Sequence, residues 1–220
     1  MSAQGAAPER AFLAPHYNTL EQQRGAASFG MWVFLATELM LFGGLLAAYV
    51  VYRAVYPQGF AEGSRHLDLL LGGTNTAVLI CSSITMALAV RSARLGERRK
   101  LLLLLATTAI LGALFMAIKA VEYGKDAADG LVPRLAWRYD GPYPQAVQLF
   151  MLAYFALTGL HAVHLTIAIG VVVVALILAW RGAFPPAHSA SIEVIGLYWH
   201  FVDLVWIFLL PLLYLFGLQP

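Results

Sequence analysis

Six ionisable side chains that could do chemistry lie inside long apolar segments of this 220-residue sequence: Glu38, His161, His164, Glu193, His200 and Asp203. A charge at the centre of a bilayer costs roughly 2.5–3.5 kcal/mol on insertion scales, so each group there needs a partner or a function. Carboxyl and imidazole groups at membrane depth can pass protons, imidazoles can ligate haem iron, and either can hydrogen-bond between helices. The sequence favours hydrogen bonding between helices and leaves a proton relay open.

Cofactor binding by the chain itself is not favoured. Only three histidines lie within apolar segments, and His161 and His164 belong to the same segment. Such a set cannot assemble the paired axial ligands of a two-haem bundle, and a copper centre near a haem would need still more ligands. Cys81 has no second cysteine to pair with, which excludes disulfides and CxxC-type sites. We therefore expect no catalytic residue, no metal ligand and no cofactor in this chain.

Glu38 is the most isolated of the six groups. It lies about ten residues into its apolar segment, which places it near the membrane midplane at a rise of about 1.5 Å per residue. Helical spacing surrounds it with apolar side chains such as Phe34 and Phe42. These surroundings favour the neutral, protonated carboxyl group unless a partner helix supplies hydrogen-bond donors.

The last apolar segment carries three ionisable groups on one helical face, namely Glu193, His200 and Asp203. Asp203 lies at about midplane depth, counted inward from the start of the segment. We expect Asp203, Glu38 and the two histidines of the preceding segment to meet if the fold brings their helices together.

A second group of polar residues, Lys119, Glu122 and Tyr123, lies at the outer end of the third apolar segment. Lys119 and Glu122 are three residues apart, a spacing that favours an ion pair along one helix. We expect this pair at the membrane interface, with the lysine side chain snorkelling toward water.

Composition places all these groups in a membrane. Hydrophobic residues make up 60% of the chain and charged residues only 12%, against about a quarter charged in soluble domains. The fold class is therefore all-α: a polytopic membrane protein with five transmembrane helices in one bundle. Residues 1–27 form an extramembrane N-terminal arm and residues 28–220 the transmembrane domain. The expected spans are residues 28–52, 69–90, 101–121, 146–180 and 192–218.

Charge distribution predicts the orientation. The connector 91–100 carries five of the chain's fourteen Lys and Arg residues, so the positive-inside rule places it in the cytoplasm. With five spans, the N-terminus is then cytoplasmic and the C-terminus outside. The formal net charge of +2 gives no support for a nucleic-acid partner.

Four sequence runs resemble subunit III of the haem-copper cytochrome c oxidases. The run YWHFVDLVW, Tyr198–Trp206, resembles the signature of that family's last helix, and ALTGLHAVH, residues 156–164, resembles the segment before it. MWVFLATELMLFGG, residues 31–44, resembles the family's glutamate-bearing helix, and Glu122-Tyr123 matches a Glu-Tyr pair that closes a middle helix. Two positions depart from the family pattern: Ala162 stands where glycine is expected, and Lys119 where an uncharged polar residue is expected.

The resemblance implies the five-helix bacterial form of this subunit in a respiratory terminal oxidase, which reduces oxygen to water and pumps protons. It implies an accessory, non-catalytic chain that supports proton uptake and the stability of subunit I. Haem and copper belong to partner subunits I and II, with subunit I as the main contact in a hetero-oligomeric complex. It also implies bound phospholipid in a cleft beside the bundle and a place in the bacterial cytoplasmic (inner) membrane. Glu38 corresponds to the family's buried helix glutamate.

Two alternatives remain open from the sequence. The chain could be the related subunit that accompanies nitric oxide reductase, which shares the five-helix pattern. It could instead be a stand-alone proton-coupled transporter that uses Glu38 and Asp203. Cytochrome c and quinol both remain possible electron donors, because other subunits determine the donor.

Overall fold

The computed structural model describes residues 19–134, 137–182 and 189–215, and these residues are helical apart from the connectors between the helices. The elements are α2 (Leu20–Val55), α3 (Pro57–Arg65), α4 (Leu69–Arg94), α5 (Arg98–Ala128), α6 (Pro144–Trp180), α7 (Ser189–Leu210) and a π-helical turn, η2 (Pro211–Leu215). Within these described ranges, five helices are long and apolar enough to cross a membrane, where α7 and η2 count as one. The predicted all-α fold with five spans is confirmed.

Local sequence signals set the helix boundaries. The hydroxyl of Thr19 accepts a hydrogen bond from the backbone N–H of Gln22 at 3.1 Å and caps the start of α2. The Asp68 carboxylate caps α4 in the same way through the N–H groups of Leu70 and Leu71. Between α4 and α5, Gly96 adopts a positive φ of 71°, which glycine tolerates and which reverses the chain after α4.

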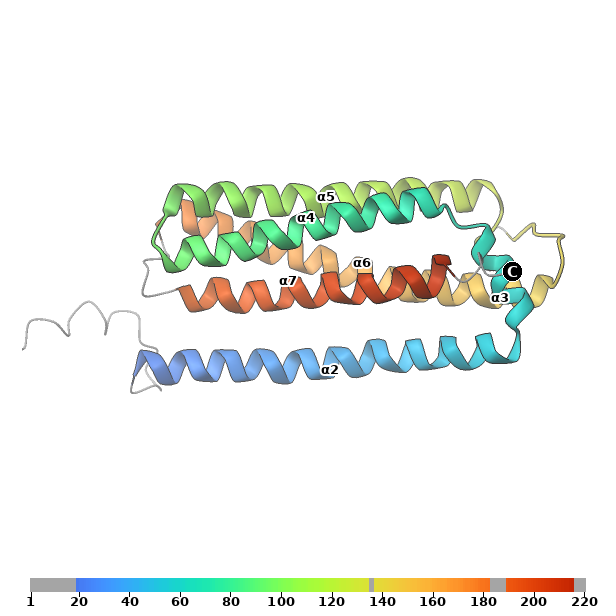
Figure 1. Cartoon of the computed structure of the whole chain (residues 1–220), viewed down its shortest axis with the longest axis horizontal. Helices are drawn as coiled ribbons and strands as arrows, with labels where there is room; N and C mark the ends of the chain where they lie inside the picture. The colour runs from blue at the N-terminus through green and yellow to red at the C-terminus, as the bar shows by residue number, and fades with distance from the viewer. Residues whose placement is uncertain (1–18, 135–136, 183–188, 216–220) are drawn as a thin grey trace, which may run out of the picture.

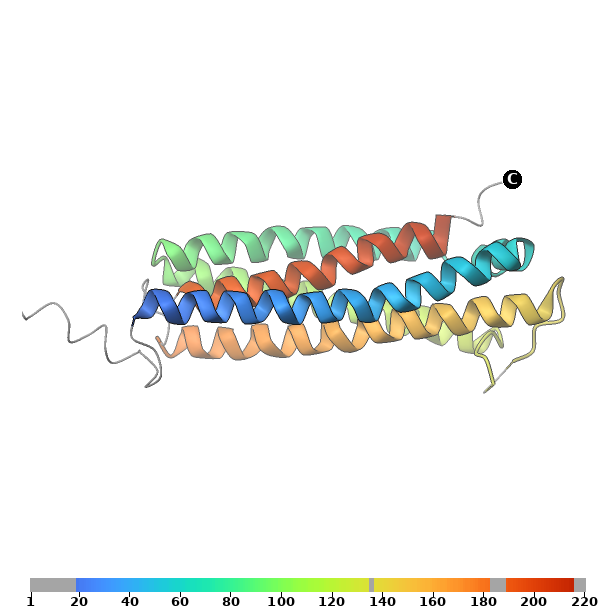
Figure 2. The same cartoon turned by 90° about the horizontal axis from the view of Figure 1, so that it is seen from below.

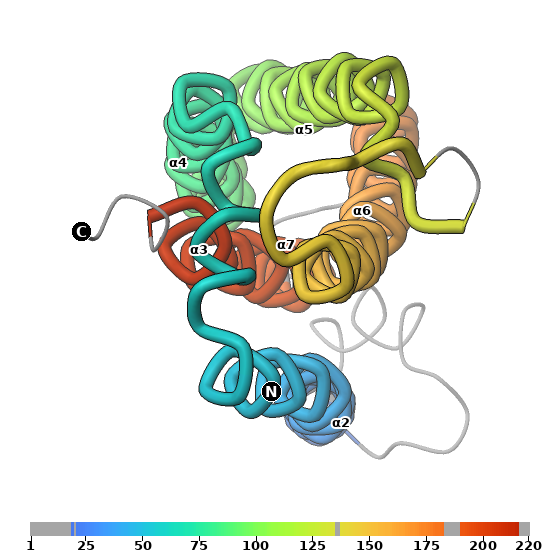
Figure 3. The backbone as a smooth tube through the Cα atoms, turned by 90° about the vertical axis from the view of Figure 1, so that its right-hand side faces the viewer, coloured from blue at the N-terminus to red at the C-terminus, as the bar shows by residue number. Residues whose placement is uncertain are grey.

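Helices α4, α5, α6 and α7 form a bundle, and α2 runs beside it against α6 and α7 (Figure 1). The view along the bundle shows α4 and α5 on the side opposite α2 (Figure 3). The start of α2, the α4–α5 turn and the start of α7 lie at one end, and α3 crosses the other end (Figures 1 and 2). The described residues therefore begin and finish at opposite ends, as an odd number of spans requires.

Helix α2 buries only a narrow stripe. Leu35, Phe42 and Tyr49 repeat every seven residues and are 7%, 2% and 2% exposed. A strict seven-residue repeat covers the seam of a helix pair rather than a wide face. The rest of α2 carries exposed apolar side chains, including Trp32 and Met40. These require a covering of lipid or of another protein.

The spans differ from the predicted ones mainly at their ends. Helix α2 begins at Leu20 rather than at residue 28, and α5 continues to Ala128 rather than ending at 121. Hydropathy windows miss such ends because polar helical turns project beyond the hydrocarbon layer. The last predicted span, 192–218, begins at Ser189, and its residues 216–218 lie outside the described residues, as do residues 1–18 of the predicted arm.

Helix α3 is an element that the hydropathy pattern does not predict. It occupies part of the connector after the first span and begins with Pro57 at its first position, where proline is favoured. Gly59 and Gly63 face α6, so closely that a β-carbon on Gly59 would lie 2.2 Å from that of Ala146. The four-residue spacing of these glycines allows two helix backbones to approach. Helix α3 thereby closes the bundle at that end.

Candidate functional site

Glu38 of α2 pairs with His164 of α6. The carboxylate Oε2 lies 2.8 Å from Nε2 of the imidazole, and both side chains are largely buried. Phe42 packs against the His164 ring at a centroid distance of 5.1 Å, and the Tyr198 hydroxyl donates to the His164 carbonyl at 3.3 Å. The partner helix that the sequence left open is therefore α6, and it supplies a polar partner for the carboxyl group.

The hydrogen bonds of His164 fix where its protons are. Nδ1 lies 2.8 Å from the carbonyl oxygen of Leu160. A carbonyl oxygen only accepts, so Nδ1 must carry a proton. The contact between Nε2 and Glu38 then contains one further proton, which is on either the carboxyl group or the imidazole. The pair can thus hold a proton at membrane depth, and either arrangement leaves it with no net charge.

The three ionisable groups of α7 all lie toward α4, as the predicted common face requires. Glu193 forms an ion pair with Arg94 at 2.9 Å, and Nδ1 of His200 lies 2.8 Å from the hydroxyl of Ser83. Asp203 is only 3% exposed, and neither of its carboxylate oxygens has a hydrogen-bond partner. Ser83 of α4 is a polar neighbour of Asp203, but the two side chains do not meet hydrogen-bond geometry.

The expected meeting of Asp203, Glu38 and both histidines is confirmed only for Glu38 and His164, and it is wrong for Asp203 and His161. Glu38 pairs with His164 alone, whereas Asp203 lies on the α4 side of α7. His161 is 1% exposed, and neither ring nitrogen has a hydrogen-bond partner. Its ring packs against Phe115 and Trp206 at centroid distances of 5.6 and 5.2 Å. Side chains three residues apart on a helix point in directions about 60° apart. His164 therefore faces α2, whereas His161 faces the inside of the bundle.

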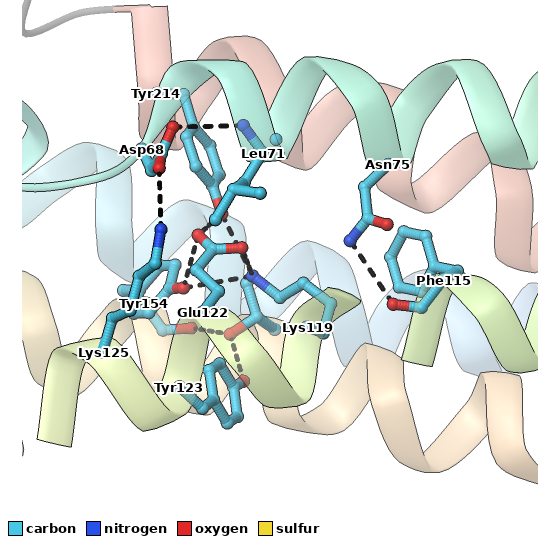
Figure 4. Close-up of polar contacts among 12 residues, drawn as sticks. Asp68, Leu71, Asn75, Phe115, Lys119, Glu122, Tyr123, Lys125, Tyr154 and Tyr214 are labelled. Atoms are coloured by element: carbon cyan, nitrogen blue, oxygen red, sulfur yellow. Dashed lines mark hydrogen bonds and ion pairs between the residues drawn. The ribbon is translucent and has the colours of Figure 1, made fainter. Parts of the chain in front are cut away.

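Lys119 and Glu122 form the expected ion pair, at 2.9 Å, but the pair lies inside the bundle (Figure 4). The two residues are only 4% and 1% exposed, so the expectation that Lys119 snorkels to the interface is wrong. The physical reason is that other helices supply partners at that depth. The amine donates to the hydroxyls of Tyr154 at 3.1 Å and Tyr214 at 3.0 Å.

The two tyrosines complete a closed network around the pair. Tyr154 donates to Glu122 Oε1 at 3.0 Å, and Tyr214 donates to the same oxygen. Asp126, one further turn along α5, is 5% exposed and leaves Oδ2 without a partner. Tyr154, Tyr214 and Asp126 are not predicted as site residues from the sequence. The spacing of Asp126, four residues after Glu122, is the one signal that could have found it.

Tyr123 points to a different neighbour from the pair beside it. Its hydroxyl lies 2.6 Å from the hydroxyl of Thr158, in the run that resembles the family's fourth-span motif. Thr158 in turn donates to the carbonyl of Tyr154 at 2.6 Å. The contact ties α5 to α6 next to the buried ion pair.

An exposed ion pair lies near the same end of the bundle. Lys125 and Asp68 are 3.3 Å apart and remain substantially exposed (Figure 4). The N–H of Leu71, hydrogen-bonded to the carboxylate, holds the pKa of Asp68 below its usual range, and Lys125 adds to this effect. Asp68 therefore stays ionised as the cap of α4.

The polar groups of the spans are spread over separate contacts. In the part of the chain that the structure describes, no three His, Cys, Asp or Glu side chains gather where they could hold a metal ion. Cys81 lies at an exposed position and is a free thiol. The arrangement can hold protons and tie helices together.

Comparison with known proteins gives consistent matches over almost the whole chain. The family model for cytochrome c oxidase subunit III matches residues 6–218. The chain is 34% identical over 191 residues to cytochrome c oxidase subunit 3 of Synechocystis sp., a match that covers 85% of this chain and 74% of the relative. It is 29% identical over 193 residues to cytochrome bo(3) ubiquinol oxidase subunit 3 of Pseudomonas aeruginosa, covering 88% and 86%. With cytochrome c oxidase subunit 3 of Corynebacterium diphtheriae it shares 32% over 189 residues, covering 85% and 86%.

Proposed function

The chain belongs to the cytochrome c oxidase subunit III family, and we propose that it acts as the accessory, cofactor-free subunit of a respiratory haem-copper terminal oxidase. The observation that carries this proposal is the extent of the similarity, since residues 6–218 include all five spans. Both partners of the Glu38–His164 pair lie within that match. The relatives support the oxidase function and lend no support to a nitric oxide reductase subunit or a stand-alone transporter.

Under this proposal, electron transfer and oxygen reduction take place in partner subunits. Haem and copper reside in subunits I and II, and subunit I is the main contact of this chain. Two features support a partner: α2 buries only a narrow stripe within the chain, and exposed apolar side chains such as Trp32 cover the remainder. Bound phospholipid supplies part of the covering. The chain supports proton uptake and protects the catalytic subunit.

We further propose that the end with the α4–α5 turn faces the cytoplasm, in the bacterial inner membrane. That turn carries Arg91, Arg94, Arg98, Arg99 and Lys100. Such a density of cations at one membrane edge is typical of the cytoplasmic side. The N-terminus is then cytoplasmic, and the C-terminus is outside.

Removing this chain from the purified complex tests the accessory function. The remaining complex is expected to keep its haem and copper absorption and to begin turnover, but to lose activity sooner than the complete complex. The haem and copper absorption is expected to remain because no three His, Cys, Asp or Glu side chains gather at one place among the described residues. Loss of a haem or copper signal in proportion to the chain removed would contradict the proposal.

Glu38→Gln is expected to leave the subunit in the complex. An amide has nearly the size of a protonated carboxyl group, and its N–H can donate to Nε2 of His164. Glu38→Val is the control, because it leaves the buried imidazole unpaired at a cost of about 1–3 kcal/mol. Subunit content of the purified complex, read from a stained gel, gives the answer. Equal loss of the subunit from the complex in both variants would mean that Glu38 has to be ionised and paired with a protonated His164.

A further inference from the structure

A groove opens between α4 and α5 next to the turn that joins them. Its volume is about 440 Å³, within the roughly 300–1,000 Å³ of small-molecule sites. Eight residues line it: Leu88, Arg91, Ser92, Leu95, Glu97, Lys100, Leu103 and Leu104. All of these residues belong to α4, α5 or the turn between them, and these two helices lie on the side of the bundle opposite α2 (Figure 3).

The lining divides into an apolar part and a charged part. Leu88 and Leu103 face the groove and are 44% and 68% exposed. They lie six and five residues inside the ends of α4 and α5, or roughly 8–9 Å toward the hydrocarbon. Arg91 and Lys100 lie nearer the turn. An occupant that fits both parts must be apolar at the deeper end and polar at the level of the headgroups.

The charged part has an excess of cations. Lys100 is paired with Glu97 at 2.9 Å. Arg91 makes no hydrogen bond or ion pair with any described residue. The lining residues therefore carry two positive charges and one negative charge, which leaves one cation to be balanced.

The other arginines of the turn are directed elsewhere. Arg94 is paired with Glu193 of α7 at 2.9 Å. Arg98 donates to the carbonyl oxygens of Ala179 and Trp180, at the end of α6. Both still raise the positive potential around the groove, so Arg91 is the cation best placed to bind an anion there.

We propose that this groove binds an anionic phospholipid of the phosphatidylglycerol type, with its phosphate on Arg91 and an acyl chain along Leu88, Leu103 and Leu104. Basic clusters at a membrane edge attract anionic lipids, and a phosphate accepts charge-assisted hydrogen bonds from a guanidinium group. A zwitterionic headgroup would bring its own cation into a turn that already holds five. The proposal requires only that the chain lies in a membrane, so it does not depend on the proposed function.

The test compares two arginines of the same turn. Arg91→Gln and Arg99→Gln remove the same charge, but only Arg91 lines the groove. The complex that contains this chain is purified into nanodiscs of phosphatidylcholine with increasing phosphatidylglycerol, and bound lipid is counted by native mass spectrometry. Loss of a charge-assisted hydrogen bond is expected to weaken phosphatidylglycerol binding about ten-fold in Arg91→Gln. Arg99→Gln is expected to bind as the wild type does.

Three results would overturn the proposal. Equal weakening in both variants would show attraction to general surface charge. Equal retention of phosphatidylcholine and phosphatidylglycerol by the wild type would show that the groove does not select an anion. A photo-crosslinker in place of Leu103 is expected to label lipid, and labelling of a partner subunit instead would show that protein fills the groove.

Discussion

Lys119→Met is expected to destabilise the chain by about 3–5 kcal/mol, the usual cost of removing one partner of a buried ion pair. Methionine keeps the length of the side chain but leaves Glu122, which is 1% exposed, without its cation. The hydroxyls of Tyr154 and Tyr214 also lose the amine that donates to them. The measurement is the amount of the chain in membranes and its thermal unfolding midpoint in detergent.

Two controls test whether the loss of stability comes from the unpaired buried charge and not from replacing a lysine as such. Lys125→Met removes a lysine from an exposed pair with Asp68, which is worth about 0–1 kcal/mol. Lys119→Met combined with Glu122→Gln removes both charges and is expected to recover much of the loss, because no unpaired buried ion remains. If the single Lys119 variant were as stable as the Lys125 variant, the pair would have no structural role.

Gly59→Leu is expected to displace α3 from α6 and to cost about 3 kcal/mol, at the upper end for overpacked sites. A β-carbon there would lie 2.2 Å from that of Ala146, and the backbone of α6 leaves no room for adjustment. Docking of α3 buries Phe60, whose ring centroid lies 5.3 Å from that of Tyr49 and 5.6 Å from that of Phe150. Thermal unfolding of the complex and protease sensitivity near α3 report the change.

Gly73→Ala is the matched control for this prediction. A β-carbon at Gly73, in α4, would meet nothing within 4 Å within the chain. Alanine also favours the helix over glycine by roughly 0.5–1 kcal/mol. This variant is therefore expected to be as stable as the wild type or slightly more stable. Similar losses in both variants would mean that glycine is needed for flexibility and not for close packing.

The sequence predicts the five spans well because the bilayer imposes a strong local rule. About 20 consecutive apolar residues are needed to cross it, and each of the five segments satisfies this without reference to any other. Helix α3 is missed because its stability comes from Gly59 and Gly63 against α6, not from its own hydropathy. A hydropathy window uses only neighbouring residues, so it carries no information about contacts between distant segments.

For the candidate site, the sequence predicts which residues share a helical face, but it does not predict their partners on other helices. The ion pair of Lys119 and Glu122 is local, and its spacing predicts it. Its burial depends on Tyr154 and Tyr214, which are 35 and 95 residues away from the lysine. Glu38 lies 126 residues from His164, and membrane depth alone could not show that it pairs with this group and not with Asp203.

The identity of the complex around this chain is the most direct test of the central claim. The measurement is the reduced-minus-oxidised absorption spectrum of whatever purifies with an affinity-tagged copy from its native membrane. We predict that the chain elutes with larger subunits that carry haem and copper, and that the spectrum shows haem. A lone, stable and colourless protein would contradict the assignment as a subunit of a terminal oxidase.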